Sequence, residues 1–214
     1  MDLDTYKKIF SEEDAVGWDA IDEVVDALYP NQEPTHYAPD FPASLGGDSY
    51  LDGISVYQSD KQEPHFHFVT YGFSNLYYDE KSAGGDYSGF GFELTFRLKK
   101  TGGKNVTWAI NFLQNIAKYV FTSGNYFEPY HVFPANSPIR LDYNTELIAV
   151  AFVLDPELGE IETPHGTVQF LQAVGITSQE FQMLKKDFSI GKVEELMGHL
   201  RKDNPLLITD LDRK

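Results

Sequence analysis

The sequence contains no cysteine. Without a thiol, the chain cannot form a disulfide framework, a thiolate zinc site or a cysteine nucleophile. It also has no apolar run that approaches the ~20 residues needed for a membrane-spanning helix. Its first residues lack the basic-then-apolar order of a secretory signal. We therefore expect a cytoplasmic protein that does not enter a membrane.

Basic residues are few compared with acidic ones. The chain has 17 Lys and Arg against 33 Asp and Glu, which gives a formal net charge of −16 and an isoelectric point near 4.6. Such a field repels the phosphates of nucleic acids and acidic membranes, and it attracts basic partners. Direct binding of nucleic acid is therefore disfavoured. A surplus of carboxylates can also serve only to keep a protein in solution, so charge alone identifies no partner.

The length and the 42% hydrophobic content allow a full core and fit one large domain over residues 1–214 better than two small ones. Apolar residues that alternate or run without a break predict strands at 54–57, 65–71, 90–98, 147–154, 167–176 and 206–208. Apolar stripes at spacings of three and four predict helices near 11–29, 107–121, 177 onward and 193–200. Because helices fall before, between and after the strands, we predict a mixed α/β fold, a three-layer α/β/α sandwich around a mixed β-sheet.

Two histidines stand one residue apart in the strand predicted at 65–71. Alternate residues of a strand share a face, so His65 and His67 point the same way and could both reach one metal ion. A third ligand at a spacing typical of a metal motif is missing. We favour a structural strand whose histidines make ordinary hydrogen bonds. The alternative hypothesis is an enzyme or metal-dependent protein that uses His65 and His67.

The sequence shows no catalytic constellation. The glycine-rich run at 83–89 leads into a strand and lacks the lysine of a phosphate-binding P-loop. Residues 72–76 have only the first half of the nucleophile-elbow pattern of serine hydrolases, because the second glycine is absent. We therefore expect no enzyme activity, no catalytic residues, no bound metal and no cofactor.

Distinctive blocks of sequence follow one another along the chain. They are LYPNQ at 28–32, LGG at 45–47, EPHFH at 63–67, YGFSNLY at 71–77, SGFGFELTFRLK at 88–99, KYVF at 118–121, TPHG at 163–166 and LITD at 207–210. In content and order these blocks resemble the N-terminal domain of Suppressor of fused proteins. The resemblance runs from about residue 18 to 212, which we take as the core of the domain.

This resemblance implies a binding scaffold without catalysis. Animal members of the family are two-domain proteins that sequester zinc-finger transcription factors of the Hedgehog pathway. Their partner peptide resembles an added strand clamped between the N- and C-terminal domains, so backbone hydrogen bonds supply affinity. The resemblance of this sequence is to the N-terminal domain alone, so we expect half of this clamp to be missing. We therefore do not transfer the transcription-factor function to it.

Within the N-terminal domain, the resemblance implies partner contacts from the KYVF block and from the loop after it. The partner-binding residues that we predict are Tyr119, Phe127, Tyr130 and His131. Tyr130 stands where the animal proteins carry an aspartate, so we expect a different partner. From the residues alone, Tyr119 can also be a helix residue packed on the sheet, and Phe127 a buried anchor of the loop.

Single-domain relatives resemble bacterial proteins proposed to be immunity factors, which neutralise toxins exchanged between competing cells. Many such toxins are basic nucleases, and an acidic protein could steer onto a cationic active site and cover it. The functional hypothesis is therefore a non-enzymatic protein-binding domain, with a basic toxin as candidate partner and immunity as candidate role. We expect neither nucleic acid nor a membrane as partner, and the sequence leaves the oligomeric state open.

Overall fold

The computed structural model describes residues 1–39, 47, 49–101 and 106–214. Its helices are α1 (Leu3–Ile9), α2 (Val16–Leu28), α3 (Thr107–Ser123), α4 (Ser178–Lys186) and α5 (Ile190–Asp203). Its strands are β1 (Thr35–Tyr37), β2 (Gly53–Ser59), β3 (His65–Tyr71), β4 (Tyr87–Lys99), β5 (Val132–Pro134), β6 (Leu147–Leu154), β7 (Glu160–Thr163) and β8 (Gly166–Thr177). The LGG block lies mostly outside the described residues. Within the described part of the chain, no helix has the length and apolar character that crossing a membrane requires.

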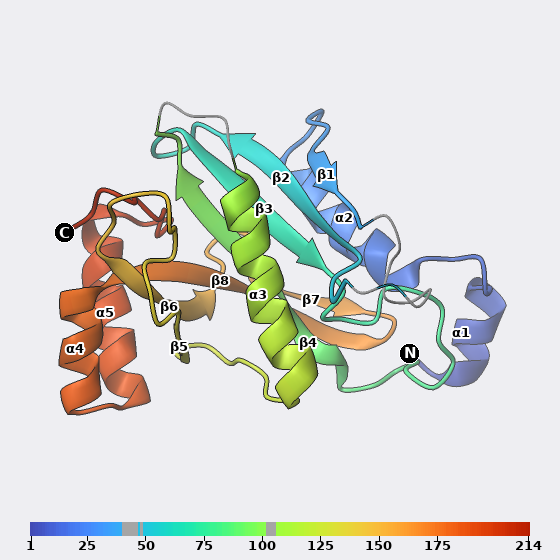
Figure 1. Cartoon of the computed structure of the whole chain (residues 1–214). Helices are drawn as coiled ribbons and strands as arrows, with labels where there is room; N and C mark the ends of the chain where they lie inside the picture. Colours follow the sequence, from blue (N-terminus) through green and yellow to red (C-terminus); the bar gives the residue numbers. More distant parts are fainter. Residues whose placement is uncertain (40–46, 48, 102–105) are drawn as a thin grey trace.

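The strands form one mixed, eight-stranded sheet (Figure 1). The order across the sheet is β1-β2-β3-β4-β8-β6-β5, and β7 pairs with the first part of β8. β4 and β8 run parallel, whereas the other described pairs are antiparallel. β8 is therefore a central strand, and β1 and β5 lie at the two edges.

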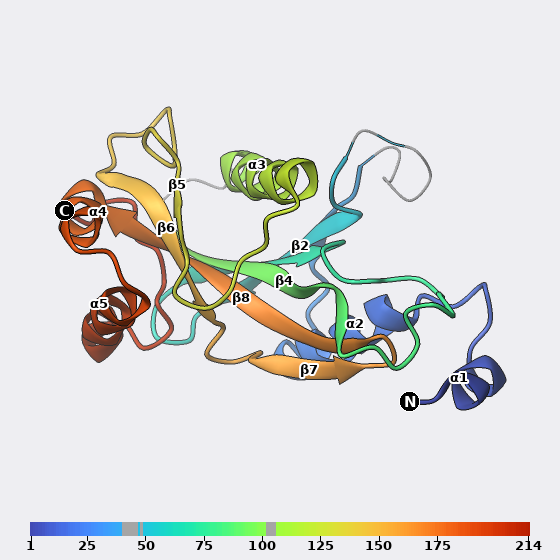
Figure 2. The same ribbon diagram turned by 90° about the horizontal axis from the view of Figure 1, so that it is seen from below.

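Helices cover both faces of the sheet (Figure 2). On one face, α3 packs Leu113 into a cluster that also contains Phe152 of β6. On the other face, α2 places Ile21 in a cluster over β2 and β3. A separate cluster on that second face joins Leu184 of α4 and Met197 of α5 to β6 and β8. The three-layer α/β/α arrangement predicted from the sequence is thus confirmed.

Alternation along β4 separates apolar from polar side chains. The residues on the side of α3 are Phe92, Leu94, Phe96 and Leu98. The residues between them are Glu93, Thr95 and Arg97, and all three are fully buried. Because successive strand residues point to opposite faces, these polar groups share the face that α2, α4 and α5 cover. A buried polar strip therefore crosses the centre of the molecule.

The N-terminal helical region differs from its prediction. The helix expected near 11–29 begins only at Val16. Before it, Ser11 and Asp14 form a turn in which the backbone N–H of Ser11 donates to the Asp14 carboxylate at 2.7 Å. The short helix α1, which the pattern analysis did not predict, comes before this turn. The hydrogen bond from Ser11 to the Asp14 side chain stabilises a turn at the residues where the sequence pattern predicted the first turn of the helix.

The strand predicted at 206–208 is replaced by a single bridge between Leu98 and Thr209. The amide of Gln172 donates to the carbonyl oxygens of Leu206 and Leu207, at 2.9 and 3.0 Å. A buried side chain thus satisfies backbone groups that a neighbouring strand would otherwise have to satisfy. The apolar run is buried here without continuous strand pairing.

Candidate functional site

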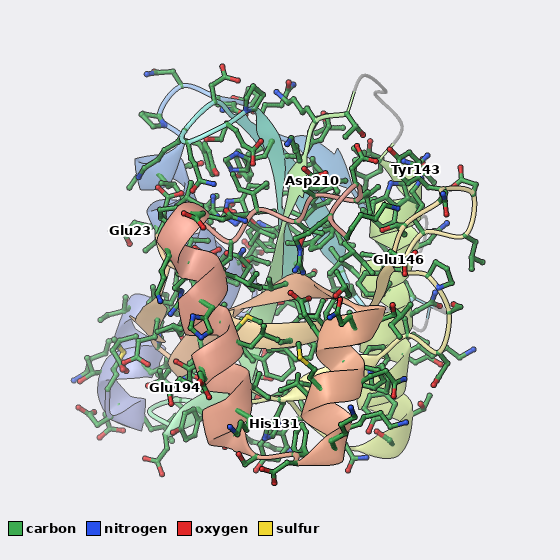
Figure 3. The ribbon with its side chains drawn as sticks, turned by 90° about the vertical axis from the view of Figure 1, so that its left-hand side faces the viewer. Glu23, His131, Tyr143, Glu146, Glu194 and Asp210 are labelled. Carbon is green, nitrogen blue, oxygen red and sulfur yellow. The ribbon has the colours of Figure 1, made fainter. Side chains whose placement is uncertain are left out.

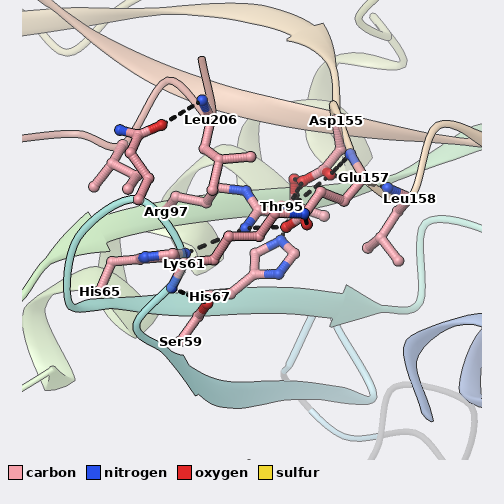
Figure 4. A network of polar contacts seen from close by, with 12 residues as sticks. Ser59, Lys61, His65, His67, Thr95, Arg97, Asp155, Glu157, Leu158 and Leu206 are labelled. Atoms are coloured by element: carbon pink, nitrogen blue, oxygen red, sulfur yellow. Dashed lines mark hydrogen bonds and ion pairs between the residues drawn. The ribbon is translucent and has the colours of Figure 1, made fainter. Parts of the chain in front are cut away.

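His67 lies inside a buried polar network at the centre of the sheet (Figure 4). Its Nε2 atom is 3.1 Å from Oδ2 of Asp155, and its Nδ1 atom is 2.7 Å from the hydroxyl of Tyr29. A carboxylate can only accept, so the Nε2–H group donates to Asp155 and Nδ1 accepts from Tyr29. The neutral imidazole therefore satisfies both partners.

His65 has the opposite tautomer. Its Nδ1 atom is 2.8 Å from the carbonyl oxygen of Glu63, which can only accept, so Nδ1–H donates there. Its Nε2 atom then accepts from Nη1 of Arg97 at 3.2 Å. Protonating Nε2 would put a second donor against the guanidinium. The two histidines thus lie side by side, as predicted, but they have different partners.

Arg97 is the hub of this network, and its side chain is fully buried. Its Nη2 atom donates to Oδ1 of Asp155 at 3.1 Å, and its Nη1 atom lies 2.9 Å from Oε2 of Glu157. Its Nε atom donates to Gln172 at 3.3 Å. Lys61, which is largely exposed, pairs with the outer oxygen of Glu157. The buried cation is therefore neutralised by two carboxylates.

Asp155 holds the end of β6 in place. Its carboxylate accepts from the Thr95 hydroxyl at 2.8 Å and from the backbone N–H groups of Glu157 and Leu158 at 2.9 and 3.0 Å. Burial alone would raise the pKa of Asp155, but the imidazole, the Arg97 guanidinium and these donors hold it well below its usual range. The carboxylate is therefore ionised and fully bonded.

The network is closed to solvent and to ligands. Both histidine side chains are fully buried, and burial lowers the pKa of each imidazole, with the Arg97 charge acting in the same direction. Each ring nitrogen of His65 and His67 already has a hydrogen-bond partner. Among the described residues, no group of three or more His, Asp or Glu side chains is arranged to hold a metal ion. This geometry supports a structural role for His65 and His67.

Glu93 forms a second buried polar centre, which the sequence analysis did not identify. Its Oε1 atom accepts from the backbone N–H groups of Gly72 and Ser74, both at 2.9 Å, and from the Ser74 hydroxyl at 2.7 Å. Its Oε2 atom accepts from the Thr70 hydroxyl at 2.7 Å. Burial raises the pKa of Glu93 to about 7, although these donors act against the shift. The only sequence signal was one acidic residue in an apolar alternating strand.

Two of the predicted partner-binding residues are in contact with each other. Tyr119 lies on α3 with 39% of its surface exposed, and its ring centroid is 5.9 Å from that of Phe127. Phe127 is only 7% exposed, and its ring centroid is 4.2 Å from that of Phe152. The chain thus presents Tyr119 at the surface and supports it from below with Phe127.

The other two predicted residues, Tyr130 and His131, directly precede β5. Tyr130 has a positive φ of 69°, donates its N–H to the carbonyl of Phe152 and packs beside the α4–α5 cluster. The backbone carbonyl of His131 accepts from the N–H of Phe152 at 2.9 Å, and its ring contacts Glu128. Figure 3 shows the side of α4 and α5 and labels His131. Tyr130 therefore lies beside a different cluster from Tyr119.

The chain matches the family model described as Suppressor of fused protein (SUFU) over residues 47–214. It is 34% identical to the Suppressor of fused homolog of Homo sapiens over 198 residues, which cover 87% of this chain and 41% of the human protein. The chain thus spans well under half the length of this relative.

Two solved structures are similar in fold. A chain in the crystal structure of the Sufu–Fu complex has a TM-score of 0.83 and 31% identity, covering 94% of this chain and 91% of that one. A putative SUFU homolog from Neisseria gonorrhoeae has a TM-score of 0.62 and 14% identity, covering 92% and 95% respectively, and shares the fold. The family model covers well over half of the sequence, and the chain belongs to the Suppressor of fused family.

Proposed function

We propose that this chain is a non-enzymatic protein-binding domain that accepts an extended segment of its partner as an added strand beside β5. The solved relative in the Sufu–Fu complex supports protein binding as the general activity. The closed network around His65 and His67 favours binding over catalysis, because it leaves no ring nitrogen for a substrate. We treat residues 1–214 as one cytoplasmic domain in this proposal.

The observation that carries the proposal is the edge position of β5. The carbonyl of His131 and the N–H of Ala135 both bond to β6. Because bonded residues alternate in an antiparallel pair, the N–H and C=O of Val132 and the C=O of Pro134 face away from β6. An edge strand of this kind offers the backbone groups that strand addition requires.

A groove beside β5 can hold side chains of the added segment. It has a volume of about 520 Å³ and lies between α3 and the segment from Phe133 to Asp142. Trp108 and Phe112 of α3 supply apolar surface, and Asn111 supplies an amide. Tyr119 lies on the same helix, and its ring centroid is 5.4 Å from that of Phe133. Exposed tyrosine beside a groove is typical of residues that dominate binding energy.

The net charge of −16 favours a basic partner. Within this proposal, the partner is a basic protein such as a toxin, and binding neutralises it as an immunity protein does. Carboxylates would speed the encounter and make it sensitive to salt, whereas strand addition would supply the specific contacts.

The proposal is tested by recovering partners from the native cell lysate at low and high salt and then measuring the affinity of the purified pair. Val132→Pro removes the outward N–H without removing a bond to β6, and we expect binding to weaken roughly tenfold or more. Val132→Ala is the matched control, because it keeps this N–H. Tyr119→Ala is expected to weaken binding by a similar factor.

Equal affinity of wild type, Val132→Pro and Tyr119→Ala would rule out this surface as the binding site. A captured partner that is acidic, or whose binding does not respond to salt, would contradict the basic-toxin part of the proposal. Circular dichroism confirms that each variant is folded before affinities are compared.

A further inference from the structure

A cavity of about 420 Å³ opens between α2 and the strands β1 and β2, near the opposite edge of the sheet from β5. Three aromatic side chains, Trp18, Tyr29 and Tyr57, line it. Trp18 stacks on Tyr71 with 4.4 Å between ring centroids, and Tyr29 stacks on Tyr57 with 4.6 Å. The aromatic surfaces of the cavity are therefore held in place before any ligand arrives.

The charged residues that line the same cavity are all acidic. They are Asp22 and Asp26 of α2 and Glu33 of the segment after it. No lysine or arginine is among the described lining residues, and burial lowers the pKa of the lining His36, although Asp22 acts in the opposite direction, so its imidazole favours the neutral form. Asp22 and Asp26 are one helical turn apart, a spacing at which like charges repel. The cavity thus combines aromatic faces with uncompensated negative charge.

Asp22 is the carboxylate in this cavity whose pKa is raised. It is half-buried, accepts a hydrogen bond at 2.9 Å from the hydroxyl of Tyr71 and also bonds to the side chain of Trp18, and both bonds act to lower its pKa. Burial raises the pKa of Asp22, and the neighbouring charge of Asp26 raises it further. A positive charge in the cavity would lower the electrostatic energy of both carboxylates. Aromatic faces would add a cation–π attraction to the same charge.

We propose that this cavity binds a guanidinium group, carried either by a small molecule or by an arginine side chain of another protein. A guanidinium is flat and weakly hydrated, so it stacks on an accessible aromatic ring such as that of Trp18. Its N–H groups can also donate to a carboxylate such as Asp22 in pairs, which a compact ammonium does less well. The site is far from β5 in the sheet order and does not depend on strand addition there.

The first experiment titrates the full chain with agmatine, which carries a guanidinium and a terminal ammonium, with putrescine, which has an ammonium in place of the guanidinium on the same four-carbon chain, and with butylurea, which is neutral. Isothermal calorimetry is expected to show saturable binding of agmatine in the millimolar range or tighter, binding of putrescine at least roughly tenfold weaker, and none of butylurea. Trp18 is one of two tryptophans, so in the Trp108→Phe variant its fluorescence reports on this cavity alone. We expect a change in Trp18 fluorescence that saturates at the same concentrations.

Variants distinguish the effect of the cavity carboxylates on binding from the effect of the protein's overall negative charge. Asp22→Asn and Asp26→Asn each remove one carboxylate from the cavity, and we expect each to weaken agmatine binding roughly tenfold. Glu23→Gln removes the same charge from an exposed position of α2 that does not line the cavity. This control is expected to leave the affinity within roughly twofold of wild type, because Glu23 lies outside the cavity and salt screens its charge over the longer distance to the ligand.

The source of the guanidinium is distinguished by a second ligand, acetyl-glycyl-arginyl-glycine amide. Tighter binding of this peptide than of agmatine assigns the site to an arginine of a partner protein, and the reverse order assigns it to a small molecule. The proposal is overturned if agmatine gives no saturable signal at millimolar concentration. Equal losses in Asp22→Asn, Asp26→Asn and Glu23→Gln would also overturn it, because only the overall charge would then matter.

Discussion

The guanidinium of Arg97 forms an ion pair with the carboxylate of Asp155, with Nη2 3.1 Å from Oδ1, and both side chains are fully buried. Two strands that are far apart in sequence, β4 and β6, thus share one ion pair on the side of the sheet away from α3. A buried pair of this kind gives modest net stability while both partners are present, but losing one partner leaves an unpaired charge. The pair therefore makes β4 and β6 dependent on each other.

Asp155→Ala is expected to lower the free energy of unfolding by about 3–5 kcal/mol, because it leaves the buried Arg97 with only one of its two carboxylates and removes the acceptor of His67. Urea unfolding followed by circular dichroism measures the change. Asp210→Ala is the matched control, since Asp210 pairs with Lys99 at 2.8 Å but both side chains are partly exposed. We expect a loss of no more than about 1 kcal/mol there. Similar losses in the two variants would show that burial of the Arg97 pair is unimportant.

Glu93 is expected to make stability depend on pH. Its pKa is about 7 in the folded chain, above its ordinary value of 4.5, so the folded state holds a proton that the unfolded state releases. Its contribution to stability is therefore present at low pH and is lost as the pH rises towards 7. From near pH 5 to near pH 8, the unfolding free energy of wild type relative to Glu93→Gln is expected to fall by about 2–3 kcal/mol.

The comparison with Glu93→Gln isolates this effect, because the buried histidines act in the opposite direction in both proteins. Their folded pKa values are lowered, so they reduce stability as the pH falls below their ordinary value. Urea unfolding of both proteins at each pH provides the data. A difference between wild type and variant that stays constant with pH would mean that Glu93 does not change its protonation on unfolding.

Phe127 and Tyr119 are expected to differ in their effects on stability. Phe127→Ala removes a buried ring and is expected to cost about 3–5 kcal/mol of unfolding free energy. Tyr119→Ala removes a ring that is 39% exposed and is expected to cost less than half as much. Thermal unfolding by calorimetry ranks the two variants. A larger loss for Tyr119→Ala would show that this residue is mainly part of the core and would weaken its role in binding.

Added Zn²⁺ is expected to leave the midpoint of thermal unfolding unchanged. A metal that binds the folded chain raises this midpoint, but each ring nitrogen of His65 and His67 already bonds to another group. The measurement compares calorimetric scans with zinc, with a chelator and with neither. A zinc-dependent increase that disappears in His67→Gln would revive the metal hypothesis for this strand.

Several features could be predicted from the sequence because they depend on neighbouring residues. The apolar run at 147–154 coincides with β6. Alternation placed His65 and His67 on one face, and the helix predicted from 177 onward is α4, which begins with a capping box formed by Thr177 and Glu180. Periodicity and capping are set by backbone geometry over a few residues, so the sequence alone contains them. The mixed α/β class followed from the order of such segments.

Other features were decided only by tertiary structure. His67 bonds to Tyr29, which is 38 residues away, and to Asp155, which is 88 residues away. No sequence pattern predicts contacts at these separations along the chain, because the order of the strands in the sheet determines which segments lie side by side. The same holds for Glu93, whose partners come from the end of β3 and the loop after it. The sequence determined which way each side chain points along its own strand, whereas the packing of distant segments determined the partner it meets and hence its charge.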